Sequence, residues 1–220
     1  MITLALDAST YRGSVAVLEG ERLLVERSPA MRGKEAELLM PAVHQALHDS
    51  GYDLRAVERI VCGAGPGSFT SLRIAASIAK GLAVARSLPL FAVSSLALIV
   101  GGNVSDGPRG ARRYLAALDA LRGESYVAEF EHDAGSVRSV GDMRRIPSED
   151  VIASAEGVGA RAVGPDQREP WHPHARGVAL LMGMLDEAGP VKLAAWEPIY
   201  GRMAEAQVKW ETAHGRTLPR

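Results

Sequence analysis

Two short segments carry residue types that could handle phosphate, and the first is a turn at Asp7. Asp7 closes the apolar run of residues 2–6 and is followed by Ala8, Ser9 and Thr10. A carboxylate at a strand end, beside hydroxyls in a tight turn, can orient a hydrated Mg²⁺ ion and cradle a phosphate. The same groups can instead satisfy the amides of an ordinary turn. Ala8 favours this second interpretation, because its methyl group limits how closely a phosphate can approach the backbone.

The second segment is Gly65-Pro66-Gly67-Ser68-Phe69-Thr70, which precedes and opens a predicted helix. Free backbone N–H groups and the helix dipole make such a position a ready anion site. The segment is not a P-loop, because no Gly-Lys-Ser/Thr sequence follows it. The alternative is a tight connection between a strand and a helix, with Ser68 or Thr70 as N-cap. Both interpretations of Gly65, Gly67 and Ser68 remain open at this point.

Other groups that could bind a metal ion or react have simpler interpretations. His44 and His48 are four residues apart in a predicted helix, a spacing that can place two imidazoles on one metal ion, with Glu37 seven residues before His44. Both histidines fall outside most of the apolar stripe of that helix, so we expect them on the surface and predict no metal site. Cys62, the single cysteine, ends an apolar run and is expected in the core. A lone cysteine forms no intramolecular disulfide, which favours a reducing compartment.

Composition bounds the class of protein. The chain has 220 residues, of which 47% are hydrophobic and 23% charged, enough to bury the core of one large or two small domains. The formal net charge of -1 gives no overall positive field that would attract nucleic acid. The start of the chain lacks a basic region, and no apolar stretch is long enough to span a bilayer. We therefore expect a cytoplasmic protein that does not enter a membrane.

These residues must be positioned by alternating strands and helices. Apolar runs separated by Gly13 and Gly20 predict a three-stranded antiparallel meander. Apolar residues at helical spacing predict a helix over 34–49, in which Pro41 marks the first turn or a kink and Gly51 a stop. The remaining expected elements of the first half are a strand at 59–62, a helix at 69–86, a strand at 90–93 and a further helix capped by Ser94 or Ser95.

The second half repeats the opening pattern of the first. The polar stretch 101–113, rich in glycine and arginine, is the best boundary. After it, Ala117-Leu118-Asp119-Ala120 echoes Ala5-Leu6-Asp7-Ala8 and again precedes a second apolar strand, at 126–130. A helix at 148–155, a strand at 160–163 and a helix at 177–186 are expected next. The pattern predicts two related lobes, 1–105 and 112–200. For the charged tail 201–220, a helix that packs back on the first lobe is one possible arrangement.

The predicted helix 69–86 carries many small residues. Ala75, Ala76, Ser77, Ala79 and Gly81 are spread around more than one of its faces. One face is expected to pack on the sheet, and the rest can simply be solvated, as is usual for a surface helix. Small residues also let another helix approach closely, so a second face could instead meet a partner, with the helix at 35–49 as its neighbour in that interface.

Together these residues resemble the TsaB (YeaZ) family of the actin-like, glycoprotease-like superfamily. The resemblance is strongest in Gly65–Ile74 and the helix that follows. It is also carried by 4–10, 14–17, 38–41, 88–96, 118–120 and the closing motif Glu197-Pro198-Ile199-Tyr200. It implies an α/β fold of two actin-like (ribonuclease H-like, ASKHA) lobes, each with a mixed sheet opened by an antiparallel meander and flanked by helices.

The resemblance also implies a role without catalysis. Members of this family act as scaffold and activator of a related catalytic subunit, TsaD, which transfers threonylcarbamoyl to N6 of adenosine 37 in tRNAs that read codons beginning with A. A small ATPase, TsaE, joins the pair, and tRNA is reached mainly through the complex. An isolated subunit is expected to form a homodimer through the same surface. The residues implied for partner binding are Leu38, Leu39, Val43, Arg73, Ile74, Ser77 and Ile78.

The catalytic relative holds a metal ion with two histidines, four residues apart, after a strand similar to 90–93. Ser95 and Ile99 stand at the matching positions, and neither is a good substitute for imidazole. The resemblance therefore implies no catalytic residue, cofactor or metal, and makes Asp7, Ser9, Thr10, Gly65, Gly67 and Ser68 parts of vestigial phosphate loops. Glu35 and Ser71 depart from the family, since many members have His and Gly at these two positions.

Two alternatives to the scaffold role are an actin-like ATPase or small-molecule kinase and, less favoured, a metallopeptidase. A kinase needs a second phosphate turn in the second lobe. Asp119 is suitably placed for it, but Glu124 would repel an anion. A metallopeptidase needs metal ligands, and positions 95 and 99 do not supply them.

Overall fold

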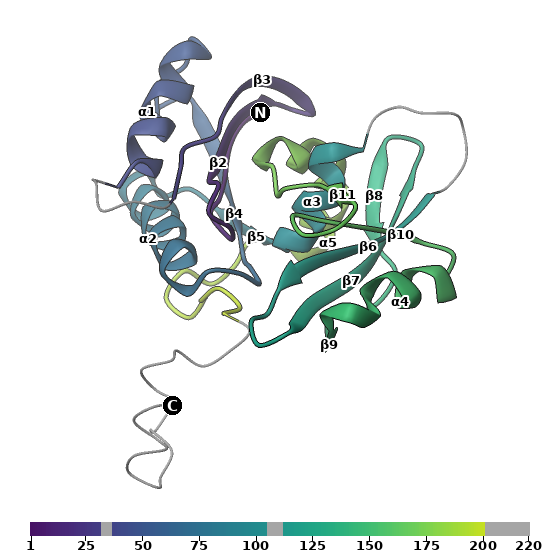
Figure 1. The fold of residues 1–220 in the computed structure, drawn as a ribbon. Coiled ribbons are helices and arrows are strands. Elements are labelled where there is room, and N and C mark those ends of the chain that lie inside the picture. The colour runs from purple at the N-terminus through teal and green to yellow at the C-terminus, as the bar shows by residue number, and fades with distance from the viewer. Residues whose placement is uncertain (32–36, 105–111, 201–220) are drawn as a thin grey trace, which may run out of the picture.

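The first of two β-sheets is built from the N-terminal half of the chain. The computed structural model describes residues 1–31, 37–104 and 112–200 (Figure 1). The sheet has the order β3-β2-β1-β4-β5. Its strands are β1 (Ile2–Asp7), β2 (Ser14–Glu19), β3 (Arg22–Arg27), β4 (Val57–Gly63) and β5 (Leu90–Val93). The first three strands pair antiparallel, whereas β1, β4 and β5 run parallel, so the predicted meander is confirmed.

The second sheet repeats this arrangement. Its order is β11-β10-β6-β7-β8. The strands are β6 (Arg112–Asp119), β7 (Glu124–Asp133), β8 (Ser136–Ser139), β10 (Arg161–Gly164) and β11 (Glu169–Pro170), and β9 (Arg144–Pro147) pairs with β7. Here too an antiparallel meander lies on one side of the first strand and parallel strands on the other. This repetition confirms the predicted fold class of two related, actin-like α/β halves.

Helices cover the sheets in layers (Figure 1). Helices α1 (Leu39–Asp49) and α2 (Phe69–Arg86) pack on one face of the first sheet. The 3₁₀ helix η2 (Ala175–Leu181) packs on its other face, against α3 (Ser95–Asn103), which in turn contacts the second sheet. The short η1 (Ser148–Asp150) leads into α4 (Val151–Gly157), which covers the far face of the second sheet, and α5 (Met182–Ala188) follows η2.

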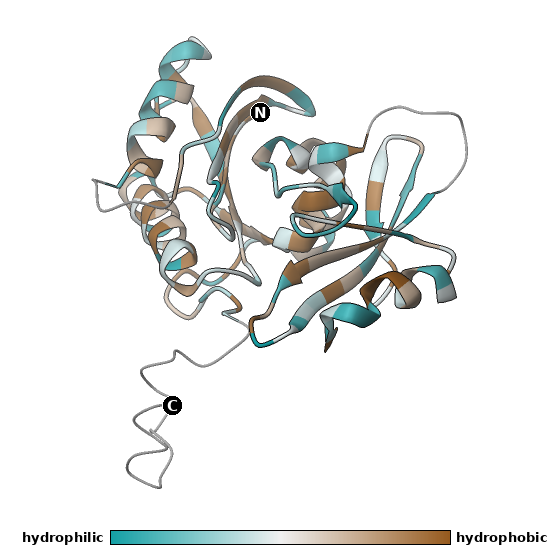
Figure 2. Ribbon diagram, viewed as in Figure 1, coloured by the Kyte–Doolittle hydropathy of each residue, from teal (hydrophilic) through white to brown (hydrophobic). Residues whose placement is uncertain are grey.

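The middle layer joins the two sheets. Helix α3 is apolar over most of its length (Figure 2), and one continuous core extends from Leu18 of the first sheet, through α3, to Phe130 of the second. Backbones of α3 and η2 touch, because a Cβ atom on Gly177 would lie 2.5 Å from the amide nitrogen of Gly102. Glycine is needed at this crossing, since a side chain would force the two helices apart. The first half is therefore packed through α3 onto the second.

Several predicted boundaries were wrong. The helix expected over 34–49 begins at Leu39, and the carboxylate of Glu37 accepts hydrogen bonds from the free amides of Leu39 and Met40. Pro41 lies in the first turn, where its missing N–H group costs nothing. The helix expected at 177–186 is a 3₁₀ helix up to Leu181. Strands β8, β9 and β11 were not predicted, and residues 34–36, with the Glu35 departure, lie outside the described residues.

The last described residues return to the first sheet. The amide of Val191 donates a 2.8 Å hydrogen bond to the carbonyl of Leu90, and the amide of Ile199 donates a 2.7 Å hydrogen bond to the carbonyl of Ala64. Val191 and Trp196 pack against the core beneath α1 and α2. The division into lobes 1–105 and 112–200 stays a prediction, and the tail 201–220 lies outside the described residues.

Candidate functional site

Asp7 lies at the end of β1 and is fully buried. Its Oδ1 atom accepts hydrogen bonds from the amide of Ser9 at 2.9 Å and from the Ser9 hydroxyl at 2.7 Å. Its Oδ2 atom accepts one from the hydroxyl of Ser95 at 2.6 Å. Burial raises the pKa of Asp7, and the hydrogen bonds from Ser95 and Ser9 oppose that rise. The carboxylate is thus occupied inside the protein and does not face solvent.

Ser95 connects Asp7 to the glycine-rich loop. Its hydroxyl oxygen accepts a 3.1 Å hydrogen bond from the amide of Gly65 while it donates to Asp7. The space around the carboxylate is closed on the other side by β4, because a Cβ atom on Gly63 would lie 1.9 Å from Asp7 Oδ2. Ser95 therefore has a structural role as a hydrogen-bonding bridge between Asp7 and the glycine-rich loop.

The two candidate phosphate segments lie against each other. The amide of Ser68 donates a 2.8 Å hydrogen bond to the carbonyl of Ser9, and a Cβ atom on Gly67 would lie 2.2 Å from that carbonyl oxygen. Ser68 occupies the N-cap of α2, but its hydroxyl contacts the hydroxyl of Ser71 at 3.1 Å and caps no amide. Thr10 bonds locally, to the backbone of Arg12. The named groups of both segments thus have hydrogen-bond partners within the protein.

The buried carboxyl of Asp7 makes a pH-dependent contribution to stability. Because its pKa is raised on folding, the folded state binds the proton more tightly, and the free energy of unfolding falls as pH rises from the ordinary to the raised pKa. Asn at this position can accept from Ser9 and donate to Ser95, yet does not titrate. We expect Asp7→Asn to gain stability relative to the parent protein across that window.

Urea unfolding of both proteins between about pH 4 and about pH 8 measures this difference. We expect the difference in free energy of unfolding between Asp7→Asn and the parent to widen as pH rises and to become constant above the raised pKa. Curves that stay parallel over the whole range would show that the carboxyl keeps its ordinary pKa, and a gap that narrows with rising pH would show that folding lowers it.

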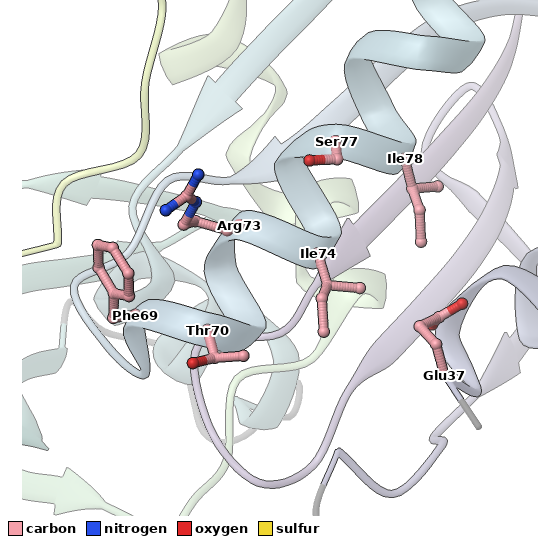
Figure 3. A pocket seen from close by; sticks show the side chains of 7 residues that line it. All are labelled: Glu37, Phe69, Thr70, Arg73, Ile74, Ser77 and Ile78. Carbon is pink, nitrogen blue, oxygen red and sulfur yellow. The ribbon is translucent and has the colours of Figure 1, made fainter. Parts of the chain in front are cut away.

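An open groove of about 470 Å³ lies beside α2. It is lined by Glu37, Phe69, Thr70, Arg73, Ile74, Ser77 and Ile78 (Figure 3). Figure 3 shows Ile74 and Ile78 on the side of α2 that faces Glu37, and Arg73 beside Phe69. Spacings of three and four residues place this series on one stripe of the helix. Four of the residues expected to bind a partner, Arg73, Ile74, Ser77 and Ile78, are thus brought together.

Two other expected contact residues are not available. Leu39 and Val43 are buried in the core between α1 and the first sheet, so the expectation that they contact a partner needs correction. The periodic stripe of α1 identifies its apolar face, and that face packs on the sheet. Leu38, in contrast, is 43% exposed just before the helix begins. Among the described residues at this end of α1, the large apolar side chains that are exposed are Leu38 and Met40.

One end of the groove carries a cation that lies over an aromatic ring. The guanidinium carbon of Arg73 lies 5.3 Å from the centre of the Phe69 ring, one helical turn before it. Phe69 in turn packs on Tyr200, with ring centroids 4.7 Å apart. Sequence reasoning quoted Phe69 and Tyr200 only as parts of motifs and assigned no role to either. The four-residue spacing of Phe69 and Arg73 was a usable signal, because side chains so spaced meet on a helix. No local pattern indicates the contact with Tyr200.

The remaining candidate residues, two histidines and one cysteine, lie where the sequence analysis expected them. His44 and His48 are exposed, as predicted, and Cys62 is fully buried, which raises the pKa of its thiol. Within the described ranges, no three side chains from His, Cys, Asp or Glu are grouped to hold a metal ion. Across the same residues, each helix is too short or too polar to cross a bilayer.

Comparison with known proteins decides the family. YeaZ from Pseudomonas aeruginosa superposes with a TM-score of 0.75 at 31% identity, over 90% of this chain and 99% of that one. The chain belongs to the TsaB (YeaZ) family. Residues 32–167, more than half of the chain, match the family model described as "TsaD: tRNA N6-adenosine threonylcarbamoyltransferase", which fits the kinship of TsaB with that enzyme.

Curated TsaB proteins are similar over a shorter region. The tRNA threonylcarbamoyladenosine biosynthesis protein TsaB of Escherichia coli is 36% identical over 62% of this chain, and that of Bacillus subtilis is 31% identical over 69%. The matches cover 58% and 62% of the length of these two TsaB proteins.

Proposed function

We propose that this chain is a scaffold and activator subunit without catalytic activity, required for threonylcarbamoyl transfer to N6 of adenosine 37 in tRNAs that read codons beginning with A. In this proposal it acts by dimerising with a catalytic subunit of the TsaD type. The observation that carries the proposal is the exposed, largely apolar α2 groove in a member of the TsaB family. The curated relatives, named for tRNA threonylcarbamoyladenosine biosynthesis, support the pathway.

The state of the phosphate segments supports binding over chemistry. Ser9 donates to Asp7, the Ser68 amide donates to Ser9 and the Ser68 hydroxyl contacts Ser71, so none of them is held ready for a nucleotide. Ser95 is buried against Asp7, and Ile99, also buried, has no atom that could ligate a metal. A kinase or a metallopeptidase would need these positions to face a substrate.

The α2 groove has the properties of a helix-docking surface. Ile74 and Ile78 supply an apolar floor, and the small side chain of Ser77 lets a partner helix approach closely. Arg73 and Glu37 place opposite charges on the groove, which can fix the orientation of a partner without carrying most of the affinity. With Leu38 and Met40 nearby, the apolar surface is one that a protein would cover, in the complex by the catalytic subunit and in isolation by a second copy.

Three further features belong to the same proposal. The small ATPase TsaE would join the assembled pair. Most tRNA contacts would come from the other subunits, because this chain has a net charge of -1 and no excess of cations to neutralise phosphates. The reaction would take place in the cytoplasm, where the tRNA substrate is found.

Reconstitution tests this proposal directly. We expect tRNA threonylcarbamoylation by TsaD and TsaE to require this chain, and the chain alone to neither hydrolyse ATP nor modify tRNA. The measurement is formation of modified adenosine with each component omitted in turn. Full activity in the absence of this chain, or ATP turnover by the chain alone, would contradict the scaffold role, and ATP turnover would favour the kinase alternative.

A further inference from the structure

We propose that Tyr200 is a positioning residue for the α2 groove, and that it acts through Phe69 to hold the guanidinium of Arg73 at one end of that groove. The proposal deepens the proposed docking function and rests on it. Tyr200 does not line the groove, whereas Phe69 and Arg73 both do. Its effect on a partner would therefore be indirect.

Three side chains form a continuous stack. The rings of Tyr200 and Phe69 have centroids 4.7 Å apart and are inclined by 56°, an arrangement that aromatic pairs favour. The guanidinium carbon of Arg73 lies 5.3 Å from the centre of the Phe69 ring, within the range of a cation–π interaction. Phe69 is only half-buried, and the Tyr200 ring is one of the groups that pack against it.

Tyr200 is itself held by the backbone next to it. The amide of Ile199 donates a 2.7 Å hydrogen bond to the carbonyl of Ala64, and the carbonyl of Ile199 lies so close to Gly65 that a Cβ atom there would approach it to 2.4 Å. Trp196 gives a second anchor, with its ring 5.7 Å from the ammonium group of Lys80 on α2. Burial and the negative charge of Glu197 raise the pKa of the Tyr200 hydroxyl, and the positive charge of Arg73 opposes that rise.

The stack restricts the side chain of Arg73, which would otherwise be a mobile, exposed arginine on a helix. A free arginine on a helix samples many rotamers, and binding must then restrict them. An arginine already held on a ring loses less of that entropy and presents its planar donors in one direction. The chemistry that such a cation recognises is a carboxylate, so we infer that the docked subunit places an acidic side chain opposite Arg73.

The test measures affinity for the TsaD-type subunit by calorimetry, using the full-length chain. We expect Tyr200→Ala to weaken binding roughly three- to tenfold, the effect of ordering one long side chain, and Tyr200→Phe to bind as the parent protein does. Arg73→Ala should weaken binding at least as much. Because Tyr200 acts through Arg73, the double variant should bind no more weakly than Arg73→Ala alone.

A second readout uses the free protein and separates the two proposals. The side-chain methylene protons of Arg73 should show ring-current shifts in the NMR spectrum from the Phe69 ring. Tyr200→Ala should reduce these shifts, and Tyr200→Phe should retain them. Unchanged shifts in Tyr200→Ala would overturn the positioning role, whether or not a partner binds.

The binding experiments also distinguish failure of the docking function from failure of the positioning role. If the parent chain fails to bind the TsaD-type subunit, the docking function fails, and the NMR result still decides whether Tyr200 orders Arg73. Additive losses in Tyr200→Ala and Arg73→Ala would show that Tyr200 acts independently of Arg73 and would overturn the inference. Val84→Ala, at a position that is 67% exposed on α2 and outside the groove, is the matched control and should bind normally.

Discussion

Ile78→Asp is expected to remove measurable docking of the catalytic subunit, with a loss of affinity of roughly a hundredfold or more. Ile78 lines the α2 groove and is partly buried against the core beneath it. A partner that covers this position would trap the new carboxylate away from water, and its neighbours among the described lining residues of α2, Ile74 and Ser77, are uncharged. An uncompensated buried charge costs more than the apolar contact that is lost. The measurement is binding to the catalytic subunit, with tRNA modification as the functional readout.

Val84→Asp is the matched control for this prediction. It places the same charge on the same helix, at a side chain that is 67% exposed and outside the groove, so binding should not change. Ser77→Arg gives a second test that spares the core, because Ser77 is exposed in the groove and a long side chain there would obstruct a partner. Normal binding by both Ile78→Asp and Ser77→Arg would place the docking surface elsewhere.

The strongest predictions from the sequence came from signals that are local in the chain. Helix α2 was predicted with its observed bounds, 69–86. The glycine-rich segment stops the preceding strand, and the helical apolar pattern stops before Ser87. In the structure Ser87 adopts a left-handed conformation that ends the helix. The repeated hairpins also follow from short apolar runs that end in Asp7 and Asp119. Such elements can be predicted because the signals for them lie in neighbouring residues, although packing supplies most of their stability.

Predictions failed where packing decides the outcome. A helical pattern at 177–186 is satisfied by a 3₁₀ helix up to Leu181, since η2 must fit against the glycines of α3. Leu39 and Val43 carry the same apolar signal as exposed Leu38, and only the position of the sheet determines which of them is covered. Periodicity identifies an apolar face but does not say what covers it.

Contacts between distant segments could not be found in the sequence at all. Glu26 on β3 meets His174 at 3.0 Å and Arg176 at 3.2 Å, and accepts a 3.0 Å hydrogen bond from Ser14. Although burial opposes ionisation, the hydrogen bond and charge of His174, the charge of Arg176 and the hydrogen bond from Ser14 lower the pKa of Glu26. Only Ser14 lies in a segment that carries the family resemblance, and no local pattern indicates that these residues tie β2 and β3 to the start of η2.

Gly65→Ala is expected to destabilise the protein by about 2–4 kcal/mol, a fall of roughly 5–15 °C in Tm for a chain of this size. Two independent causes act together at this position. Gly65 has a φ of +86°, which a residue with a Cβ atom adopts only with strain, and that atom would lie 2.4 Å from the carbonyl oxygen of Ile199. The clash is with backbone, so no side chain can simply rotate away. Thermal or urea unfolding measures the effect.

Gly81→Ala is the control, because the same chemical change should there have the opposite sign. Gly81 lies inside α2, and a Cβ atom on it would meet nothing within 4 Å beyond its own helix. Alanine in an exposed helix interior is expected to stabilise the protein by about 0.5–1 kcal/mol. Gly65→Ala should also weaken partner binding, since displacement of Ile199 moves the adjacent Tyr200 away from Phe69. If Gly65→Ala is as stable as the parent and binds as tightly, then residues 197–200 do not pack on the glycine-rich loop in solution, and the positioning role of Tyr200 fails with that contact.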